Sequence, residues 1–184
     1  MNQDFKNPIS HMLQGLAHWM AYRKEMSSIE VIEADLVFVA TDLLRASLQA
    51  DYSVRREITG KSFPCLDNRR RVDLGIYSKT QKKYCCLIEF KLADATNGGY
   101  KNDVNKLKKL KDQSQDIDCL VVILYRKLCD FTYPKEFVNS QGKAQRKHLL
   151  LDNGKVSAVV RRVCHSCSSK TSNNSLKAIC IEVL

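Results

Sequence analysis

The sequence predicts an α/β domain in which helices flank a mixed central sheet. Apolar residues recur at helical spacing through the first fifty residues, and this pattern is typical of amphipathic helices. Two apolar runs then flank the short polar segment 78–83, which predicts a hairpin of two strands. After a basic helical stretch, the continuous apolar run DCLVVILY predicts a fully buried strand, as in a parallel sheet.

Two helices are expected before the first strand. Residues 5–24 form the first, with an apolar face made by Ile9, Met12, Leu13, Leu16, Trp19 and Met20. Residues 29–49 form the second, and Glu33 falls within its apolar stripe. Because burying an unpaired carboxylate is costly, Glu33 needs an explanation. Either it reaches water or an arginine from the end of the stripe, or it contributes a carboxylate to a site.

The elements that follow complete one domain over residues 1–184. A strand is expected over Tyr52–Thr59 before the hairpin, and Asn97-Gly98-Gly99 breaks the chain after it. A basic helix over Tyr100–Asp112 then leads to a buried strand over Asp118–Leu128. This strand should lie parallel to the second hairpin strand, because a helix crosses between them.

Residues of about 28–128 therefore form the predicted core. The N-terminal helix is an addition to it, and so are weaker strand signals at 155–163 and 176–184, within a C-terminal region of about 150–184. The length of 184 residues suits one sizeable domain.

Three charged residues stand in the apolar hairpin strands: Asp73, Glu89 and Lys91. A three-residue loop at 80–82 would place Asp73 directly opposite Glu89, whereas a two-residue loop would shift the pair by one. Lys91 shares a face with Glu89 because side chains alternate along a strand. Opposed carboxylates repel, and a divalent cation such as Mg²⁺ or Mn²⁺ would remove the repulsion. The simpler alternative is a cross-strand salt bridge in which Lys91 neutralises both acids.

The charge balance indicates a polyanionic partner. Lysine and arginine number 30 against 20 aspartate and glutamate residues, so the net charge is +10. Nucleic acid is the commonest partner of such a protein, although many small proteins are basic without one. For the lysines, a solvated helix face is the alternative. The candidate phosphate contacts are Arg55, Arg56, Arg69, Arg70, Arg71, Lys101, Lys106, Lys108 and Lys109.

Eight cysteines are present, yet several lie within apolar strands, where free cysteine behaves as a small hydrophobe. No signal peptide is visible at the start and no apolar run is long enough to span a membrane. We therefore expect a reducing, cytoplasmic compartment. Cys164 and Cys167 form a CxxC motif that Cys180 and His165 could complete as a zinc site; reduced thiols are the alternative.

Asp73, the segment Glu89-Phe90-Lys91 and the order of elements around them resemble the PD-(D/E)XK nuclease superfamily, with its restriction-endonuclease-like fold. The resemblance covers roughly residues 28–128, and Val72 stands where the motif name has proline. It implies an α-β-β-β-α-β core. It also implies that Asp73, Glu89 and the backbone carbonyl of Phe90 hold one or two Mg²⁺ ions.

In that family, the helical acid matched by Glu33 would bind a second ion or its water. Lys91 would orient the attacking water or stabilise charge on the phosphate. The resemblance thus implies a Mg²⁺-dependent nuclease, with Mn²⁺ as a substitute, and we expect an endonuclease acting on DNA. The alternatives are an inactive nucleic-acid-binding module and a protein-interaction domain of the same fold. A homodimer is compatible with cutting both strands, but no interface is identifiable, and no membrane partner is expected.

Overall fold

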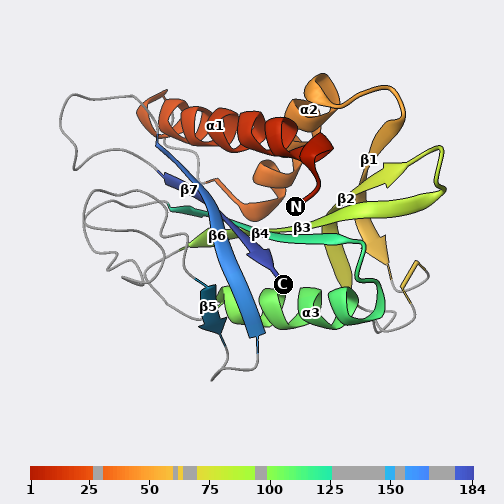
Figure 1. Ribbon diagram of the computed structural model, residues 1–184. Helices are drawn as coiled ribbons and strands as arrows, with labels where there is room; N and C mark the ends of the chain where they lie inside the picture. The colour runs from red at the N-terminus through yellow and green to blue at the C-terminus, as the bar shows by residue number, and fades with distance from the viewer. Residues whose placement is uncertain are drawn as a thin grey trace.

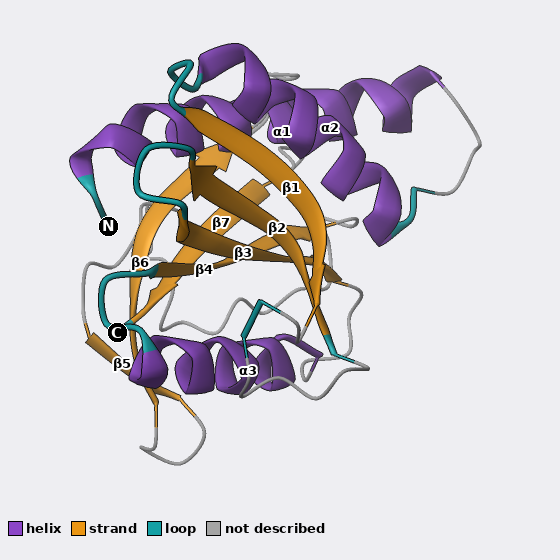
Figure 2. Cartoon of the chain, turned by 90° about the vertical axis from the view of Figure 1, so that its right-hand side faces the viewer, coloured by secondary structure: helices purple, strands orange, loops and turns teal. Residues whose placement is uncertain are grey.

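A seven-stranded mixed sheet lies between two helical layers, with two helices on one face and one helix on the other (Figures 1 and 2). This arrangement confirms the predicted α/β class with a mixed sheet flanked by helices. The computed structural model describes residues 1–26, 31–59, 62–63, 70–93, 99–125, 148–151, 156–165 and 177–184. Within those ranges no helix is long and apolar enough to cross a membrane.

The order of elements along the chain follows the prediction between residues 33 and 125. The sheet order is β1-β2-β3-β4-β7-β6-β5. The β3–β4 pair is parallel, as predicted, and the other strand pairs are antiparallel. The elements are α1 (Gln3–Met26), α2 (Glu33–Ser47), β1 (Tyr52–Thr59), β2 (Arg71–Ser78), β3 (Lys83–Ala93), α3 (Gly99–Gln113), β4 (Asp118–Tyr125), β5 (His148–Leu151), β6 (Val156–His165) and β7 (Lys177–Val183).

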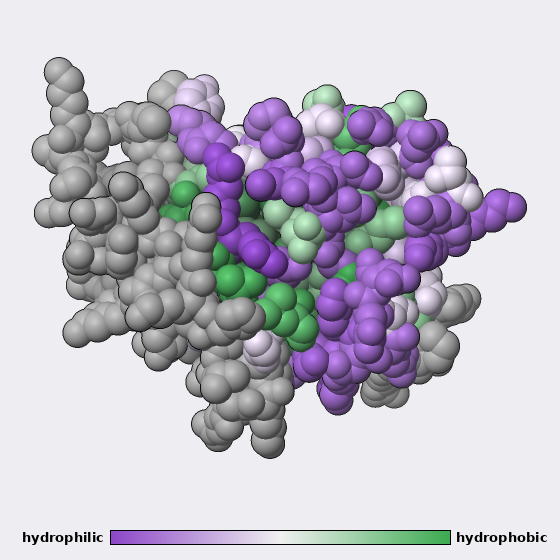
Figure 3. Space-filling view, viewed as in Figure 1, coloured by the Kyte–Doolittle hydropathy of each residue, from purple (hydrophilic) through white to green (hydrophobic). Residues whose placement is uncertain are grey.

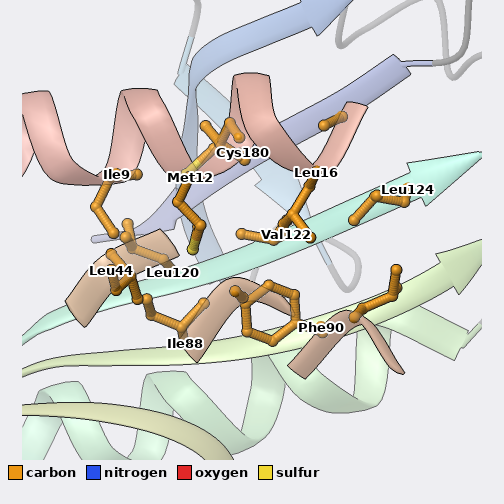
Figure 4. Close-up of a cluster of buried hydrophobic side chains, with 14 of the residues drawn as sticks. Ile9, Met12, Leu16, Leu44, Ile88, Phe90, Leu120, Val122, Leu124 and Cys180 are labelled. Carbon is orange, nitrogen blue, oxygen red and sulfur yellow. The ribbon is translucent and has the colours of Figure 1, made fainter. Parts of the chain in front are cut away.

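The apolar residues form one core on each side of the sheet. Helices α1 and α2 cover one face, where their buried side chains meet the alternate residues of β3 and β4 (Figure 4). Met12 and Leu16 of α1 lie over Leu120 and Val122 of β4 in this view. Helix α3 covers the other face through Val104, Leu107 and Leu110. Each helix is therefore held by its own apolar stripe, as the sequence pattern predicts.

Two boundaries differ from the prediction. Helix α2 begins at Glu33 rather than at residue 29, with Ile32 as its N-cap residue. The backbone amide of Ile32 donates to Asp35 Oδ2 over 3.0 Å, and this bond fixes the first turn. The short strand β5 was not predicted, and residues 126–128 of the predicted buried strand lie outside the described residues.

The hairpin loop has four residues and not the predicted three. Ser78 pairs with Lys83, which leaves residues 79–82 in the turn. A register shift follows, between Ile76 and Tyr77 on β2, and it makes Cys85 the extra residue of a β-bulge on β3. The bulge restores the predicted alignment, so that Leu74 lies opposite Ile88. The predicted register therefore holds at Leu74 and Ile88, although the predicted loop length is wrong.

Candidate functional site

Strands β2 and β3 separate where the charged residues begin. Their pairing ends at Leu74 and Ile88. Beyond this point β2 continues to Arg71 along β1, while β3 continues to Ala93 along β4. Asp73 and Glu89 therefore stand at the mouth of a fork in the sheet and are not a hydrogen-bonded pair.

Two carboxylates replace the missing strand on this edge of β3. The amide of Phe90 donates to Asp73 Oδ2 over 2.8 Å, and the amide of Leu92 donates to Glu33 Oε1 over 3.3 Å. Backbone amides in a protein interior need such acceptors. Glu33 reaches the fork because it is the first residue of α2. The structure thus brings Glu33 to Asp73 and the β3 end, as its place in the helical stripe suggested.

Two lysines, Lys91 and Lys106, form ion pairs with the carboxylates at the fork. Lys91 Nζ lies 3.1 Å from Glu33 Oε1 and 3.8 Å from Asp103 Oδ2 of α3. Lys106 Nζ, also on α3, lies 2.6 Å from Glu89 Oε1 and donates to the Arg71 carbonyl over 2.8 Å. The simple salt bridge, in which Lys91 neutralises Asp73 and Glu89, is therefore not the arrangement seen.

Glu89 is the buried centre of this cluster, with only 3% of its surface exposed. Burial raises the pKa of Glu89 to about 8, and the nearby Asp73 charge acts in the same direction. Lys106, whose ammonium lies 2.6 Å from Glu89 Oε1, opposes this rise through its charge and a hydrogen bond, yet the pKa stays raised. A buried carboxylate that lacks full compensation of this kind is typical of functional sites.

The pKa values of Asp103 and Lys91, two other charged groups of this cluster, are also shifted. Burial raises the pKa of Asp103, although Lys91 and Lys106 counteract it. Partial burial acts to lower the pKa of Lys91, but its hydrogen bond to Glu33 and the charge of Asp103 outweigh this and raise it. Lys91 is therefore a persistent cation at neutral pH.

Asp103 is the member that sequence reasoning missed, and Lys106 was predicted only as a phosphate contact and not as a partner of Glu89. The Lys106 side chain is 14% exposed. Both residues flank the apolar stripe of α3, three positions apart, so they lie on one side of that helix. In the sequence, only their position beside the apolar stripe of α3 could have indicated that these two residues belong to the site. What the sequence could not show is that α3 lies beside the fork.

The predicted phosphate contacts are distributed over several surfaces. Arg70 and Lys109 line a hollow of about 420 Å³ that also includes Asp103 and Lys106. Figure 3 shows hydrophilic residues gathering on the side of α3 and of the β2–β3 hairpin. Arg71 pairs with Glu57, and the remaining described candidates are Arg55, Arg56 and Lys108. Arg69 and the side chain of Lys101 lie outside the described residues.

In their present positions, no three Asp, Glu, His or Cys side chains of the described ranges converge as metal ligands. The chemistry of the donors nevertheless suits Mg²⁺. Four carboxylates (Glu33, Asp73, Glu89 and Asp103) face two ammonium groups. Oxygen donors with excess negative charge favour hard divalent cations. A cation at Glu89 requires Lys106 to move away.

The cysteines in the described residues are free thiols. Cys164 and Cys180 are buried in the core beneath α1, and Cys85, Cys86 and Cys119 occupy the strands in which they were expected. Cys167 lies outside the described residues. A zinc site at the CxxC motif therefore stays a prediction.

Comparisons with known proteins returned no matching family model, no matching curated protein and no matching solved structure. Function has to be inferred from the chemistry at the fork. The features available for this are the two carboxylates at its mouth, the lysine beside them and the basic hollow along α3.

Proposed function

We propose that this chain is a Mg²⁺-dependent nuclease with a restriction-endonuclease-like fold, which hydrolyses phosphodiester bonds of DNA. One observation carries the proposal. Asp73 and Glu89 meet at the fork between β2 and β3, with Lys91 on the same strand as Glu89, and the buried Glu89 is only partly compensated by its one lysine. The element order α2-β1-β2-β3-α3-β4 supports the α-β-β-β-α-β core of that fold.

The oxygen donors have distinct tasks in this proposal. Asp73, Glu89 and the Phe90 carbonyl would hold Mg²⁺ or Mn²⁺, and the metal supplies Lewis acidity and a metal-bound water acidic enough to attack near neutral pH. The amide of Phe90 fixes the Asp73 carboxylate, so Asp73 is held in one orientation beforehand. Glu33 holds Lys91 in place and offers a further oxygen ligand.

Lys91 acts as a cation in this proposal and not as a base. Its raised pKa keeps the ammonium protonated, so it can donate to a water or to a phosphate oxygen but cannot accept the water's proton. Charge stabilisation of this kind contributes most in a partly buried site. Arg70 and Lys109, which line the adjacent hollow, would contact neighbouring phosphates and position the strand without reading bases.

The test is cleavage of circular and linear DNA, and of RNA, with Mg²⁺, Mn²⁺ or EDTA. Asp73→Asn, Glu89→Gln and Lys91→Ala should each lower the rate by roughly three orders of magnitude, which corresponds to about 4 kcal/mol of transition-state stabilisation. Asp112→Asn is the matched control, since this exposed carboxylate lies on α3 and pairs only with Lys108 among the described residues.

The proposal fails if the wild type cleaves no substrate with either metal. It also fails if the three site variants cut as fast as Asp112→Asn. Circular dichroism should show that each variant retains the fold, because loss of folding in all three would indicate a structural ion-pair network.

A second candidate is a nucleic-acid-binding module without catalysis. The observation in its favour is that Lys106 and Lys91 already neutralise Glu89 and Glu33, so the network is closed without a metal. Under this alternative, DNA would bind with equal affinity in EDTA and in Mg²⁺, and no cleavage would follow.

A further inference from the structure

Strands β1, β2 and β3 carry an aromatic cluster on the α3 side of the sheet, in the part of that face that α3 does not cover. Tyr77 and Tyr84 pair across the hairpin, with ring centroids 5.2 Å apart in an edge-to-face arrangement. Phe63 packs behind Tyr84 at 5.5 Å. Arg55 of β1 completes the cluster, with its guanidinium carbon 3.6 Å from the centroid of Tyr77. Helix α3 packs on β3, β4, β6 and β7, beside this cluster.

The guanidinium of Arg55 lies over the ring of Tyr77. Its carbon is 3.6 Å from that centroid, the separation of a stacked cation–π contact, and 5.8 Å from the Tyr84 centroid. Arg55 is exposed, so a ligand can reach the guanidinium from solvent. Within the described part of the chain, no carboxylate forms an ion pair with it. The result is an open, positively charged plane with an aromatic support.

Gly75 makes room for this arrangement. A Cβ at this position would lie 2.8 Å from the Tyr84 ring, closer than side chains tolerate. Without it the Tyr84 ring lies across β2, against the neighbouring Tyr77. Gly75 stands between Asp73 and Tyr77 on one strand face, since side chains alternate. The cluster is therefore on the same strand and face as the proposed metal ligand Asp73.

We propose that the stack of Arg55, Tyr77 and Tyr84 binds an unpaired base, so that this protein prefers single-stranded nucleic acid. Guanidinium planes and aromatic rings both stack on bases, and a base inside a duplex has both of its faces covered by neighbours. The positive charge of Arg55 also suits the adjacent phosphate. This inference rests on the proposed function, because the bound strand is the substrate strand.

The spacing along β2 agrees with that role. Four residues of strand separate Tyr77 from Asp73, or roughly 13 Å, a distance that a few nucleotides of single strand can span. One strand could therefore hold a base on the stack and present a phosphate at the fork.

Binding measured in EDTA tests the inference separately from cleavage. A fluorescent 12-mer of oligo(dT) and a 12-base-pair duplex are titrated against the wild type, Arg55→Lys and Arg45→Lys. Arg55→Lys keeps the charge but loses the stacking plane. Arg45 is the matched control, because it is an exposed arginine of α2 that pairs with Asp42 and lies outside the candidate phosphate contacts. Both are surface changes that leave the core intact.

We expect Arg55→Lys to bind oligo(dT) at least fivefold more weakly, the lower limit for one stacked base, while its duplex affinity stays unchanged. Arg45→Lys should bind both as the wild type does. Equal oligo(dT) affinity for all three proteins overturns the inference, and so does an equal loss on oligo(dT) and duplex. If the wild type shows the Arg55-dependent preference yet cleaves nothing, the proposed hydrolysis fails while the stack stands. Cleavage without the preference gives the reverse result.

Discussion

Two glutamates in this sheet are equally buried and behave in opposite ways. Glu89 on β3 and Glu182 on β7 are each 3% exposed. Burial raises the pKa of Glu89 to about 8. Burial acts on Glu182 in the same direction, but hydrogen bonds from Arg161 and from the Met1 amine outweigh it and lower the pKa of that carboxyl. Burial alone therefore does not distinguish the two positions.

The difference lies in how fully each carboxylate is compensated. Glu182 accepts bonds from two cations through separate oxygens, and Asp118 beside it is held by the Asn2 amide and the Met1 amine. Glu89 has one lysine, at one oxygen, and a neighbouring Asp73 whose charge opposes its ionisation. A saturated carboxylate stabilises the fold, whereas an unsaturated one keeps capacity for a ligand. We therefore regard Glu182 as structural and Glu89 as the functional centre.

Glu182→Gln should cause the largest loss of stability. Removing the charge leaves Arg161 without its carboxylate and the Met1 amine with Asp118 alone, and breaking a buried ion pair costs about 3 kcal/mol. Urea denaturation at pH 7 measures the free energy of unfolding. Glu57→Gln is the control, since that exposed glutamate pairs with Arg71 at the surface and should cost less than about 1 kcal/mol. Equal losses in the two variants would remove the contrast between the glutamates.

Glu89→Gln should have the opposite sign, and its effect should depend on pH. The folded pKa of Glu89 is about 8 and its unfolded value is about 4.3, so between these values only the folded protein binds the proton. Wild-type stability from this group is then greatest at low pH and falls as pH rises through that window. The glutamine lacks this titration, so its stability relative to wild type should grow by about 2 kcal/mol from pH 6 to pH 8.

Thermal melting of both proteins in EDTA at several pH values provides the measurement. Asp103 and Glu182 titrate in both proteins, so their contributions largely cancel in the difference. A constant difference across the range would show that Glu89 is not held neutral by the fold.

The local features of the fold could be predicted from the sequence. The bounds of β1 were predicted residue for residue, and those of α3 to within one residue, because apolar periodicity is a short-range property. The parallel pairing of β3 and β4 followed from the crossing helix. The hairpin register was right at Leu74 although the loop length was wrong, because a bulge at Cys85 compensated.

Only some of the residues that form the site could be predicted from the sequence. Asp73, Glu89, Lys91 and Glu33 stood out as charges in apolar patterns. Lys106 did not, because a lysine on a basic helix normally faces water, and only the packing of α3 beside the fork buries it against Glu89. The neutralisation of Glu89 by a lysine is a tertiary property that no local pattern encodes.

The smallest expected effect concerns that lysine. If Lys106 takes the place that a metal would occupy at Glu89, then Mg²⁺ has to compete with it and with the proton on Glu89. At pH 8.5 and ten times its dissociation constant, Mg²⁺ should stabilise the wild type by about 1.4 kcal/mol, with a smaller effect at pH 6.5, where Glu89 keeps its proton.

Lys106→Met removes the competitor, so half of its Mg²⁺-induced shift in melting temperature should be reached at a lower Mg²⁺ concentration than in the wild type. Lys108→Met on the same helix is the control, because Lys108 pairs with Asp112 at the surface. Asp73→Asn should show little shift. If Lys106→Met needs as much Mg²⁺ as the control, or if Mg²⁺ shifts no protein, then Glu89 belongs with Glu182 as a structural carboxylate, and Lys106 is its permanent partner.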